Sequence, residues 1–465
     1  MTRVLLVSTY EQGHQPLGLA SPAAAMRAAG HDVRTLDLAA EPAAPAAFAD
    51  RDLVAISVPM HTAARLAVRL AKRLRERDPK LPIVLYGLYA SQLDAHLRDP
   101  SAAGERLVDA VVGGEYEGPL VALAEAVQTG APLSGPGVGA TPLFPRDAMP
   151  LPDRSGLPPL RDYATATVLL ADGSPEQRPA GYVEATRGCV HRCTHCPLTP
   201  TYGGRLRLIP PEFVLADIDA LVDLGARHIT FGDPDFFNAL PHAMQLLRLL
   251  KRRHPALSYD VTIKVEHLLE HEAETRSLPR FGVAWVTSAF ESVDDALLRR
   301  LAKDHTRADM ERVLDIARAS GLALRPTWLP FTPWTSLTDF RAILDFIAAH
   351  DLVPHVPPVQ YGLRLLLPPG SPLIAQAQAA GVLTGFDTDV LTHTWANPDP
   401  AVDALQGKIA AFVARVACRH DQPANHSNVF TRIRSDTALA QGAPLPRPVA
   451  LSAGWVPGLS EEWFC

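Results

Sequence analysis

Short apolar runs alternate with amphipathic stretches over the first 130 residues. Buried strands are expected at residues 3–8, 31–38, 52–58, 82–87 and 109–114. Helical periodicity fills the intervals, as in the Ala-rich stretch from about Leu19 to Ala29. Strands separated by helices predict right-handed crossovers and a doubly wound, Rossmann-like parallel sheet. A ligand of such a sheet is expected at the carboxyl ends of its strands.

Residues 131–160 are rich in proline and glycine, which predicts a linker between two domains. The alternative is a structured surface loop of one larger domain. A second series of strands and helices follows over residues 161–380. Its strands are expected at residues 181–187, 228–233, 259–264, 284–291, 322–329 and 359–367. This series predicts a partial (βα)6 barrel with catalytic residues at the strand ends. Residues 381–465 are expected to form a small, mostly helical region and a tail.

Composition narrows the possible functions. Hydrophobic residues make up 47% of the chain, yet none of its segments offers about 18 consecutive apolar residues, so no membrane span is expected. The first residues lack the pattern of a signal peptide, which favours a cytoplasmic protein. The net charge of −6 is spread without blocks and argues against a nucleic-acid partner.

Three of the five cysteines lie within eight residues, in the stretch EATRGCVHRCTHCPLTP. Cys189, Cys193 and Cys196 directly follow the first expected barrel strand, and such a cluster indicates metal rather than disulfides. Three thiolates on one loop can hold three irons of a cubane cluster and leave the fourth iron open. The alternative is a structural zinc site with His191 or His195 as the fourth ligand.

This cysteine pattern at the end of a barrel strand resembles the radical S-adenosylmethionine (SAM) superfamily. The resemblance implies a 4Fe-4S cluster whose open iron is chelated by the amino and carboxylate groups of SAM. One electron then breaks a C–S bond of SAM. The residue before the last cysteine is usually aromatic in this family and packs near the adenine. His195 occupies that position here.

Later strand ends carry further matches to the family. In GDPDFF, the resemblance implies that Asp233, or as second choice Asp235, takes the ammonium of SAM. A turn with helix-capping aspartates is the alternative. In FESVDD, the resemblance implies that Glu291 and Ser292 lie near the ribose and carboxylate of SAM. The stretch from Ser292 to Asp295 is also a good N-terminal helix cap, and both interpretations can hold together. Lys303 follows in the same stretch and is either functional or a surface charge.

Arg364 lies within the sixth expected strand. An arginine inside a barrel needs an anionic partner, which would be a carboxylate of SAM or of the substrate. The alternative is an arginine on the outer surface.

The first 125 residues resemble the cobalamin-binding domain found in many radical SAM enzymes (class B). That family commonly has a Gly-Gly pair after the fourth strand, whereas this chain has Tyr86-Gly87-Leu88-Tyr89, which would narrow the slot for cobalamin. His14 lies in the first loop without the surrounding cobalt-ligand motif, and a lone loop histidine is usually solvated. Cobalamin binding therefore stays open, with a retained fold that has lost its cofactor as the alternative.

The segments from CTHCPLTPTYGG to ARHITFGDPDFFN resemble a narrower group, the radical SAM proteins named for a C-terminal Cys-Sec-Ala-Glu-Pro or Cys-Cys-Ala-Glu-Pro tail (CUAEP/CCAEP). This chain ends at Cys465 instead. Our hypothesis is that Cys465 belongs to that tail and that the sequence was cut at a selenocysteine codon, with an ordinary terminal cysteine as the alternative. Such a cysteine pair would suit redox catalysis or a thiophilic element such as arsenic.

The same group resembles the radical SAM enzyme of arsinothricin biosynthesis. That resemblance implies transfer of an aminocarboxypropyl group from SAM to an arsenic species, and a small-molecule substrate. Cobalamin-dependent methyl transfer is the alternative, and a non-catalytic iron-sulfur or zinc sensor is an alternative of another class. A catalytic role would also require a reducing partner such as a flavodoxin or ferredoxin.

Overall fold

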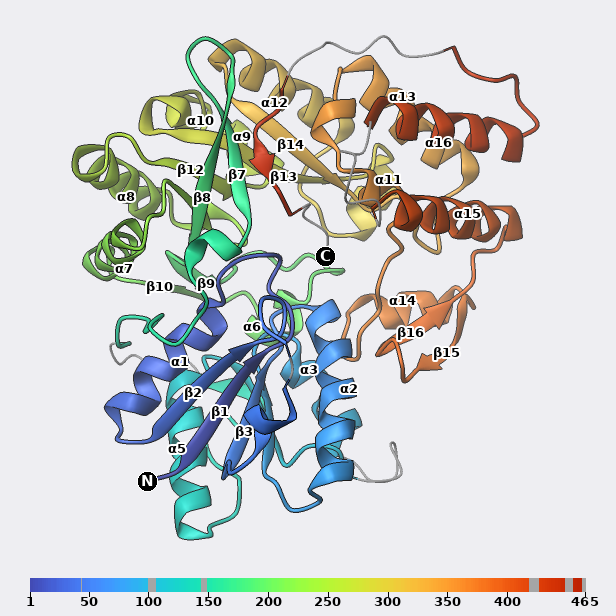
Figure 1. The fold of residues 1–465 in the computed structure, drawn as a ribbon. Helices are drawn as coiled ribbons and strands as arrows, with labels where there is room; N and C mark the ends of the chain where they lie inside the picture. Colours follow the sequence, from blue (N-terminus) through green and yellow to red (C-terminus); the bar gives the residue numbers. More distant parts are fainter. Residues whose placement is uncertain (43, 99–105, 144–148, 418–425, 448–454, 462–465) are drawn as a thin grey trace.

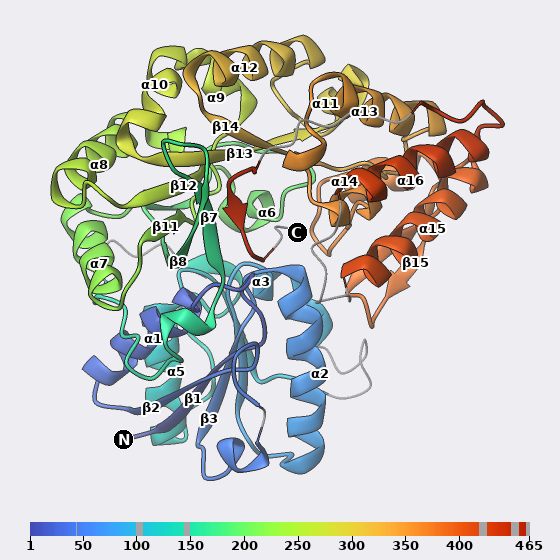
Figure 2. The same cartoon turned by 45° about the horizontal axis from the view of Figure 1, so that its top comes forward.

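The computed structural model describes residues 1–42, 44–98, 106–143, 149–417, 426–447 and 455–461 (Figure 1). Cys418 and Cys465 lie outside these residues. The chain folds into one parallel and one mostly parallel β-sheet whose carboxyl edges face each other, with a helical C-terminal part beside the second sheet (Figure 2). None of the described helices is long and apolar enough to cross a membrane.

The first sheet has six parallel strands in the order β2-β1-β3-β4-β5-β6. The strands are β1 (Arg3–Ser8), β2 (Asp32–Asp37), β3 (Leu53–Ser57), β4 (Ile83–Tyr86), β5 (Ala110–Gly114) and β6 (Gly139–Leu143). One face packs against α1 (Leu17–Ala28) and α5 (Glu117–Thr129), the other against α2 (His61–Arg77) and α3 (Ala90–Arg98). This arrangement confirms the predicted Rossmann-like fold.

Strand β6 was not predicted, because it lies inside the Pro/Gly-rich segment that was expected to be a linker. It pairs in parallel with β5 and covers an edge that would otherwise expose unpaired backbone groups. Part of the predicted linker therefore belongs to the first sheet. The limits proposed for the domains stay predictions.

The second sheet is a curled half-barrel. Its parallel strands are β8 (Pro175–Val183), β11 (His228–Phe231), β12 (Ser258–Thr262), β13 (Val283–Glu291) and β14 (Ala323–Trp328). Antiparallel strands β7 (Thr165–Leu169) and β17 (Gly458–Leu459) extend the β8 edge. The longer helices of this part are α7 (Pro211–Asp223), α8 (Leu240–Arg253), α12 (Arg307–Ser320) and α13 (Leu337–Ala349).

The sixth predicted barrel strand is absent from the described chain. In its place residues Pro358–Gly362 form a 3-10 helix, and a single parallel bridge joins Phe331 to Arg364. The fold class nevertheless holds, because the five preceding strands supply the curved sheet. The C-terminal part adds α14 (Leu373–Ala379), the hairpin β15–β16 (Leu383–Asp387 and Thr392–Trp395), α15 (Pro400–Ala417) and α16 (His426–Ala440).

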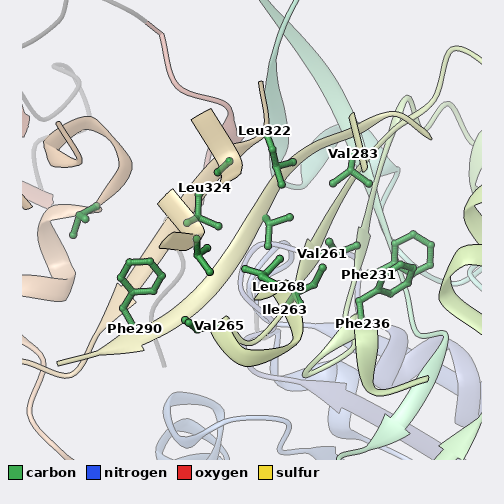
Figure 3. Packing of buried hydrophobic residues seen from close by; sticks show 14 of the residues in the cluster. Phe231, Phe236, Val261, Ile263, Val265, Leu268, Val283, Phe290, Leu322 and Leu324 are labelled. Carbon is green, nitrogen blue, oxygen red and sulfur yellow. The ribbon is translucent and has the colours of Figure 1, made fainter. Parts of the chain in front are cut away.

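The core of the half-barrel lies between the curved sheet and its helices (Figure 3). Val261, Val283 and Leu324 project from the strands, and Leu268 meets them from α9 (Val265–Glu270). Burying one such side chain contributes about 1.5–3 kcal/mol. This packing fixes the strand ends at which the polar residues of the site gather.

The end of the described chain returns to the junction of the two sheets. Strand β17 pairs with β7, and beyond it the Glu461 carboxylate accepts a hydrogen bond of 2.5 Å from the Tyr10 hydroxyl. Gly13 lies so close that an added Cβ would sit 2.9 Å from Cβ of Glu461. The first loop of the Rossmann-like sheet is thus covered by the C-terminal strand.

Candidate functional site at the barrel mouth

The three clustered cysteines lie on a loop bracketed by the antiparallel strands β9 (Thr186–Gly188) and β10 (Leu206–Leu208). Cys189 and Cys193 are buried, Cys196 is half-buried, and all three are free thiols. Burial raises the pKa of Cys189 and raises that of Cys196 to about 12. The positive charge of bound iron would reverse this effect, because a coordinating thiol is deprotonated outright. The donor set therefore fits a cluster held by three thiolates.

Backbone contacts hold this loop in place from both sides. The Thr199 hydroxyl donates to the Cys193 carbonyl (2.8 Å), within the turn that leads into α6 (Leu198–Tyr202). On the other side, the Thr194 hydroxyl donates to the Arg300 carbonyl (2.9 Å) at the end of α11 (Asp295–Arg300). The cysteine loop is thus fixed to a helix that follows β13.

Gly188 gives a direct test of the loop geometry. Its φ is +83°, and an added Cβ would overlap the Arg205 carbonyl oxygen and lie 2.8 Å from the Tyr202 ring. We expect Gly188→Ala to displace Cys189 and to lower cluster content severalfold after anaerobic reconstitution, measured as iron and sulfide per chain. Gly203→Ala is the control, because a Cβ there meets open space although its φ is also positive. Equal loss in both variants would mean that strained backbone alone explains the effect.

Two histidines of the loop face carboxylates. Nε2 of His195 lies 3.1 Å from Oε1 of Glu291, and Nε2 of His191 lies 3.3 Å from Oδ2 of Asp235. His191 and His195, the two candidates for a fourth zinc ligand, are thus each directed at a carboxylate. They favour a site in which three thiolates leave one metal position open.

Glu291 is the centre of a buried ion-pair network at the end of β13. Besides His195, it contacts Nζ of Lys303 at 3.1 Å. Burial opposes ionisation of Glu291, yet Lys303 and His195 outweigh it and hold the pKa of Glu291 well below its ordinary value. The surface alternative for Lys303 is wrong, because its side chain is only 4% exposed. Glu291 also has a left-handed backbone (φ +62°), a strain that is typical of functional sites.

Ser292 is buried next to Glu291. Its hydroxyl accepts from the backbone N–H of Asp294 (3.1 Å), and Asp294 itself caps α11. The helix cap predicted between Ser292 and Asp295 is therefore present, with Asp294 as the capping residue. A role of Ser292 in binding SAM stays a prediction.

The two aspartates of GDPDFF have different surroundings. Asp233 accepts from the Ala185 N–H (2.9 Å) and from the Thr186 hydroxyl (2.6 Å), so it ties the start of the cysteine loop to β11. Burial raises the pKa of Asp233 to about 7. Asp235 caps the next 3-10 helix by accepting from the Phe237 N–H, and its second oxygen faces His191 and a residue of α9. The predicted contact of either aspartate with SAM stays untested.

Sequence reasoning missed Glu266 and His267, which follow β12 a few residues after Lys264. Glu266 forms an ion pair with Lys264 and lies 3.8 Å from Nδ1 of His305, while His267 lies 2.7 Å from Asp235. The signal was the run Lys-Val-Glu-His directly after a strand end. Beyond these ion pairs, three further buried side-chain atoms lack a hydrogen bond of acceptable geometry in the described chain: Glu266 Oε2, His305 Nδ1 and His195 Nδ1. Buried polar atoms are normally satisfied, so this set fits a polar, charged ligand such as SAM.

Arg364 does not fit its predicted environment. It lies on no barrel strand, and its guanidinium pairs with Asp403 of α15 (2.6 Å) and stacks on the Trp395 ring. The anionic partner that an arginine requires is thus supplied by the chain itself. A contact of Arg364 with SAM or substrate stays a prediction without structural support.

At the carboxyl edge of the Rossmann-like sheet, some residues suit cobalamin binding and others do not. Tyr86 is fully buried between the sheet and α1, where its hydroxyl donates to the Gly18 carbonyl (2.7 Å), while Tyr89 packs on the opposite face. Tyr86 therefore fills space between the sheet and α1, and the narrowing of the cobalamin slot stays a prediction. At the rim, however, Gln15 and Gln92 keep buried side-chain oxygens without a partner in the described chain. Such groups fit the amide side chains of a corrin ring.

His14 is buried, contrary to the expectation that it is solvated. Its ring packs against Tyr182 of β8 at 4.8 Å, so it lies between the two sheets. Burial lowers the pKa of His14 to about 4. The His14 ring is therefore part of the interface between the two sheets.

The buried His14 gives a prediction for pH. The pKa of His14 in the folded protein lies below the ordinary value of about 6.5, so the unfolded chain takes up a proton at a higher pH than the folded protein does. The free energy of unfolding therefore falls as the pH decreases from about 6.5 toward 4. When the pH falls from 7.5 to 5.5, we expect His14 alone to lower the free energy of unfolding by about 1 kcal/mol. His14→Phe, which keeps the ring contact, should remove that share of the loss in urea unfolding of the cluster-free protein. An unchanged pH dependence in this variant would contradict the assignment.

An arginine at the interface joins the cysteine loop to the Rossmann-like sheet. Arg187 of β9 contacts Glu115 (3.0 Å), Glu117 (2.9 Å) and Glu184 (2.7 Å), and its own side chain is 4% exposed. Burial opposes ionisation of Glu117, yet Arg187 outweighs it and lowers the pKa of that carboxyl. Glu115 and Glu117 follow the carboxyl end of β5. The residue two positions before Cys189 is thus anchored to the other sheet.

Comparisons with known proteins match both parts of this architecture. A family model described as the radical SAM superfamily matches residues 183–334, and one described as a B12 binding domain matches residues 3–124. The hopanoid C-3 methylase of Methylococcus capsulatus is 25% identical over 69% of this chain and 62% of that protein. The ribosomal protein uS12 methylthiotransferase RimO of Desulfosudis oleivorans is 29% identical over 36% of this chain and 40% of that protein. The chain thus spans less than two thirds of the length of either relative.

Solved structures share the whole fold. TsrM from Kitasatospora setae, with tryptophan and a SAM analogue bound, aligns with a TM-score of 0.64 and 19% identity over 95% of both chains. OxsB with aqua-cobalamin bound aligns with a TM-score of 0.67 and 14% identity over 95% of this chain and 72% of that one. Both are described as enzymes that use SAM. The cofactors that the two matched domains imply are a 4Fe-4S cluster, SAM and cobalamin. Residues 183–334 thus form a radical SAM domain, and the B12-binding domain of residues 3–124 precedes it.

Proposed function

We propose that the protein is a cobalamin-dependent radical SAM methyltransferase that acts on a small molecule. The B12-binding domain and the methylase among the relatives support methyl transfer over aminocarboxypropyl transfer. None of the four proteins named above is described as acting on arsenic. The sequence alone favoured aminocarboxypropyl transfer, with methyl transfer as the alternative. We now place methyl transfer first.

The observation that carries this proposal is the contact between the carboxyl edge of the Rossmann-like sheet and the cysteine loop. The Gln92 side-chain amide donates to the carbonyl of Pro197, the residue after Cys196, at 2.9 Å. The Thr201 hydroxyl of α6 donates to the Leu88 carbonyl at 3.2 Å. Leu88 and Gln92 follow the carboxyl end of β4, where a doubly wound sheet binds its ligand. A ligand on that edge would thus adjoin a ligand at the cysteine loop.

Each group of residues has a role in this proposal. The three cysteines would hold the cluster, and Glu291, Lys303 and Ser292 would bind the charged amino-acid end of SAM. Gln15 and Gln92 would accept hydrogen bonds from corrin amides. When bound, the cluster supplies an electron and cobalamin supplies a carrier for a methyl group. The protein orients both and excludes water.

Product analysis tests the proposal. The full chain is reconstituted anaerobically with iron, sulfide and cobalamin, and then given SAM and dithionite, or a reduced flavodoxin or ferredoxin. Methyl transfer predicts S-adenosylhomocysteine, formed only when cobalamin is present. Methylthioadenosine that forms without cobalamin would favour aminocarboxypropyl transfer. Intact SAM in a zinc-loaded protein would favour the non-catalytic sensor.

A further inference from the structure

Three metal-ligating side chains converge beside the cysteine loop from three separate segments. His191 comes from the loop, Asp235 follows β11 and His267 lies on α9. Oδ2 of Asp235 is 3.3 Å from Nε2 of His191 and 2.7 Å from Nδ1 of His267. All three atoms lie within 4.8 Å of one another. Two imidazoles and one carboxylate thus share a small volume.

Asp235 lies at ion-pair distance from both histidines, but hydrogen bonds of acceptable geometry do not account for the convergence of all three atoms. The three atoms are buried, and none has a hydrogen-bond partner of acceptable geometry in the described chain. Asp235 is fully buried, and its other oxygen accepts from the Phe237 N–H. A buried polar atom without a partner costs about 1–3 kcal/mol, and more if it is charged. One cation at the common point would satisfy all three atoms.

The distances suit a divalent transition ion. Imidazole nitrogens and carboxylate oxygens bind such an ion at about 2.0–2.2 Å, so neighbouring ligand atoms lie about 3.0–3.4 Å apart. The observed 3.3 Å agrees with this range, and the observed 2.7 Å requires a shift of a few tenths of an ångström.

The next layer of residues has the arrangement usual around a metal. A ligating histidine commonly directs its second ring nitrogen at a carboxylate. Nδ1 of His191 lies 3.7 Å from Oε1 of Glu266, which is itself paired with Lys264. Glu266 thus stands where it would orient His191.

We infer that His191, Asp235 and His267 form a mononuclear site for a divalent first-row transition ion, separate from the cluster cysteines. Two histidines and one carboxylate suit such ions, and three protein ligands leave coordination positions open. The inference does not depend on methyl transfer. Its competitor is the predicted use of Asp235 for the ammonium of SAM.

Metal and sulfide analysis of the cluster-loaded full chain tests the site. We expect one transition ion per chain beyond the iron that matches the sulfide of a 4Fe-4S cluster. In protein isolated without this ion, added Mn²⁺ should bind, as loss of the free-ion electron paramagnetic resonance (EPR) signal. His267→Ala should lose the ion and keep the cluster. Glu266→Gln should weaken Mn²⁺ binding about 10–100-fold.

Two controls keep the test sharp. His271→Ala removes a neighbouring imidazole, whose ring centre lies 5.9 Å from that of His267 but which is outside the convergent group, and should keep the ion. Asp235→Asn keeps an oxygen for the Phe237 N–H and serves if His267→Ala fails to fold.

Two results would overturn the inference. One is wild-type protein that holds no extra ion and binds no Mn²⁺. The other is an extra ion that persists in both His267→Ala and Asp235→Asn. A wild type without the ion, together with weakened SAM binding in Asp235→Asn, would favour the ammonium role.

Discussion

Replacing Cys193 with serine is expected to abolish both the iron-sulfur cluster and every SAM-dependent activity of the protein. Three thiolates are the fewest that hold a cubane with one open iron, so two cannot retain it in this geometry. Cys193 is buried in the middle of the loop, and its carbonyl is fixed by Thr199, so no neighbouring thiol can replace it without moving that contact. The measurement is iron and sulfide content together with SAM cleavage under dithionite.

Cys418→Ser is the matched control, because Cys418 lies more than 200 residues from the loop in the sequence. It should leave cluster content unchanged. Cluster retained by Cys193→Ser at the wild-type level would contradict the assignment of the three ligands.

Replacing Arg187 with methionine is expected to lower the free energy of unfolding by about 3–5 kcal/mol. The change leaves Glu115 and Glu117 buried with less positive charge nearby, although Arg207 still pairs with Glu115. Urea unfolding of the cluster-free protein measures this loss. Because β9 ends directly before Cys189, the cluster content after reconstitution should fall as well.

Arg192→Met provides the control for Arg187. It changes an exposed arginine of the same loop that contacts only the Gly203 carbonyl among its described hydrogen bonds, and should cost less than about 0.5 kcal/mol. Adding Glu117→Gln to Arg187→Met should recover part of the loss, because it removes one unpaired charge. Arg187→Met that is as stable as Arg192→Met would show that the arginine does not join the sheets.

Features encoded by neighbouring residues could be predicted from the sequence. The spacing of apolar runs located strands β1 to β5 of the first sheet and the five parallel strands of the second, and the cysteine loop follows a strand end as expected. Glu291 and Asp235 also lie at strand ends near that loop, because parallel strands bring their carboxyl ends to one edge. The strand positions needed only local periodicity and a common topology, whereas Glu291 and Asp235 were chosen because their motifs resemble those of the radical SAM family.

Features that depend on distant partners could not be predicted. Arg364 was predicted to need a ligand because its partner Asp403 lies 39 residues further along the chain, on helix α15. His14 seemed solvated because Tyr182, which covers it, belongs to the other sheet. Glu266 and His267 carried no recognised motif, and only the fold reveals that they face His305 and Asp235.

EPR spectroscopy of the dithionite-reduced protein, with and without SAM, tests the central claim most directly. The claim is that three cysteines hold a 4Fe-4S cluster with one iron open to SAM. It predicts a reduced-cluster signal whose g values change when SAM is added, in wild type and in Cys418→Ser but not in Cys193→Ser. A protein that contains only zinc, or a cluster signal that SAM leaves unchanged, would contradict it.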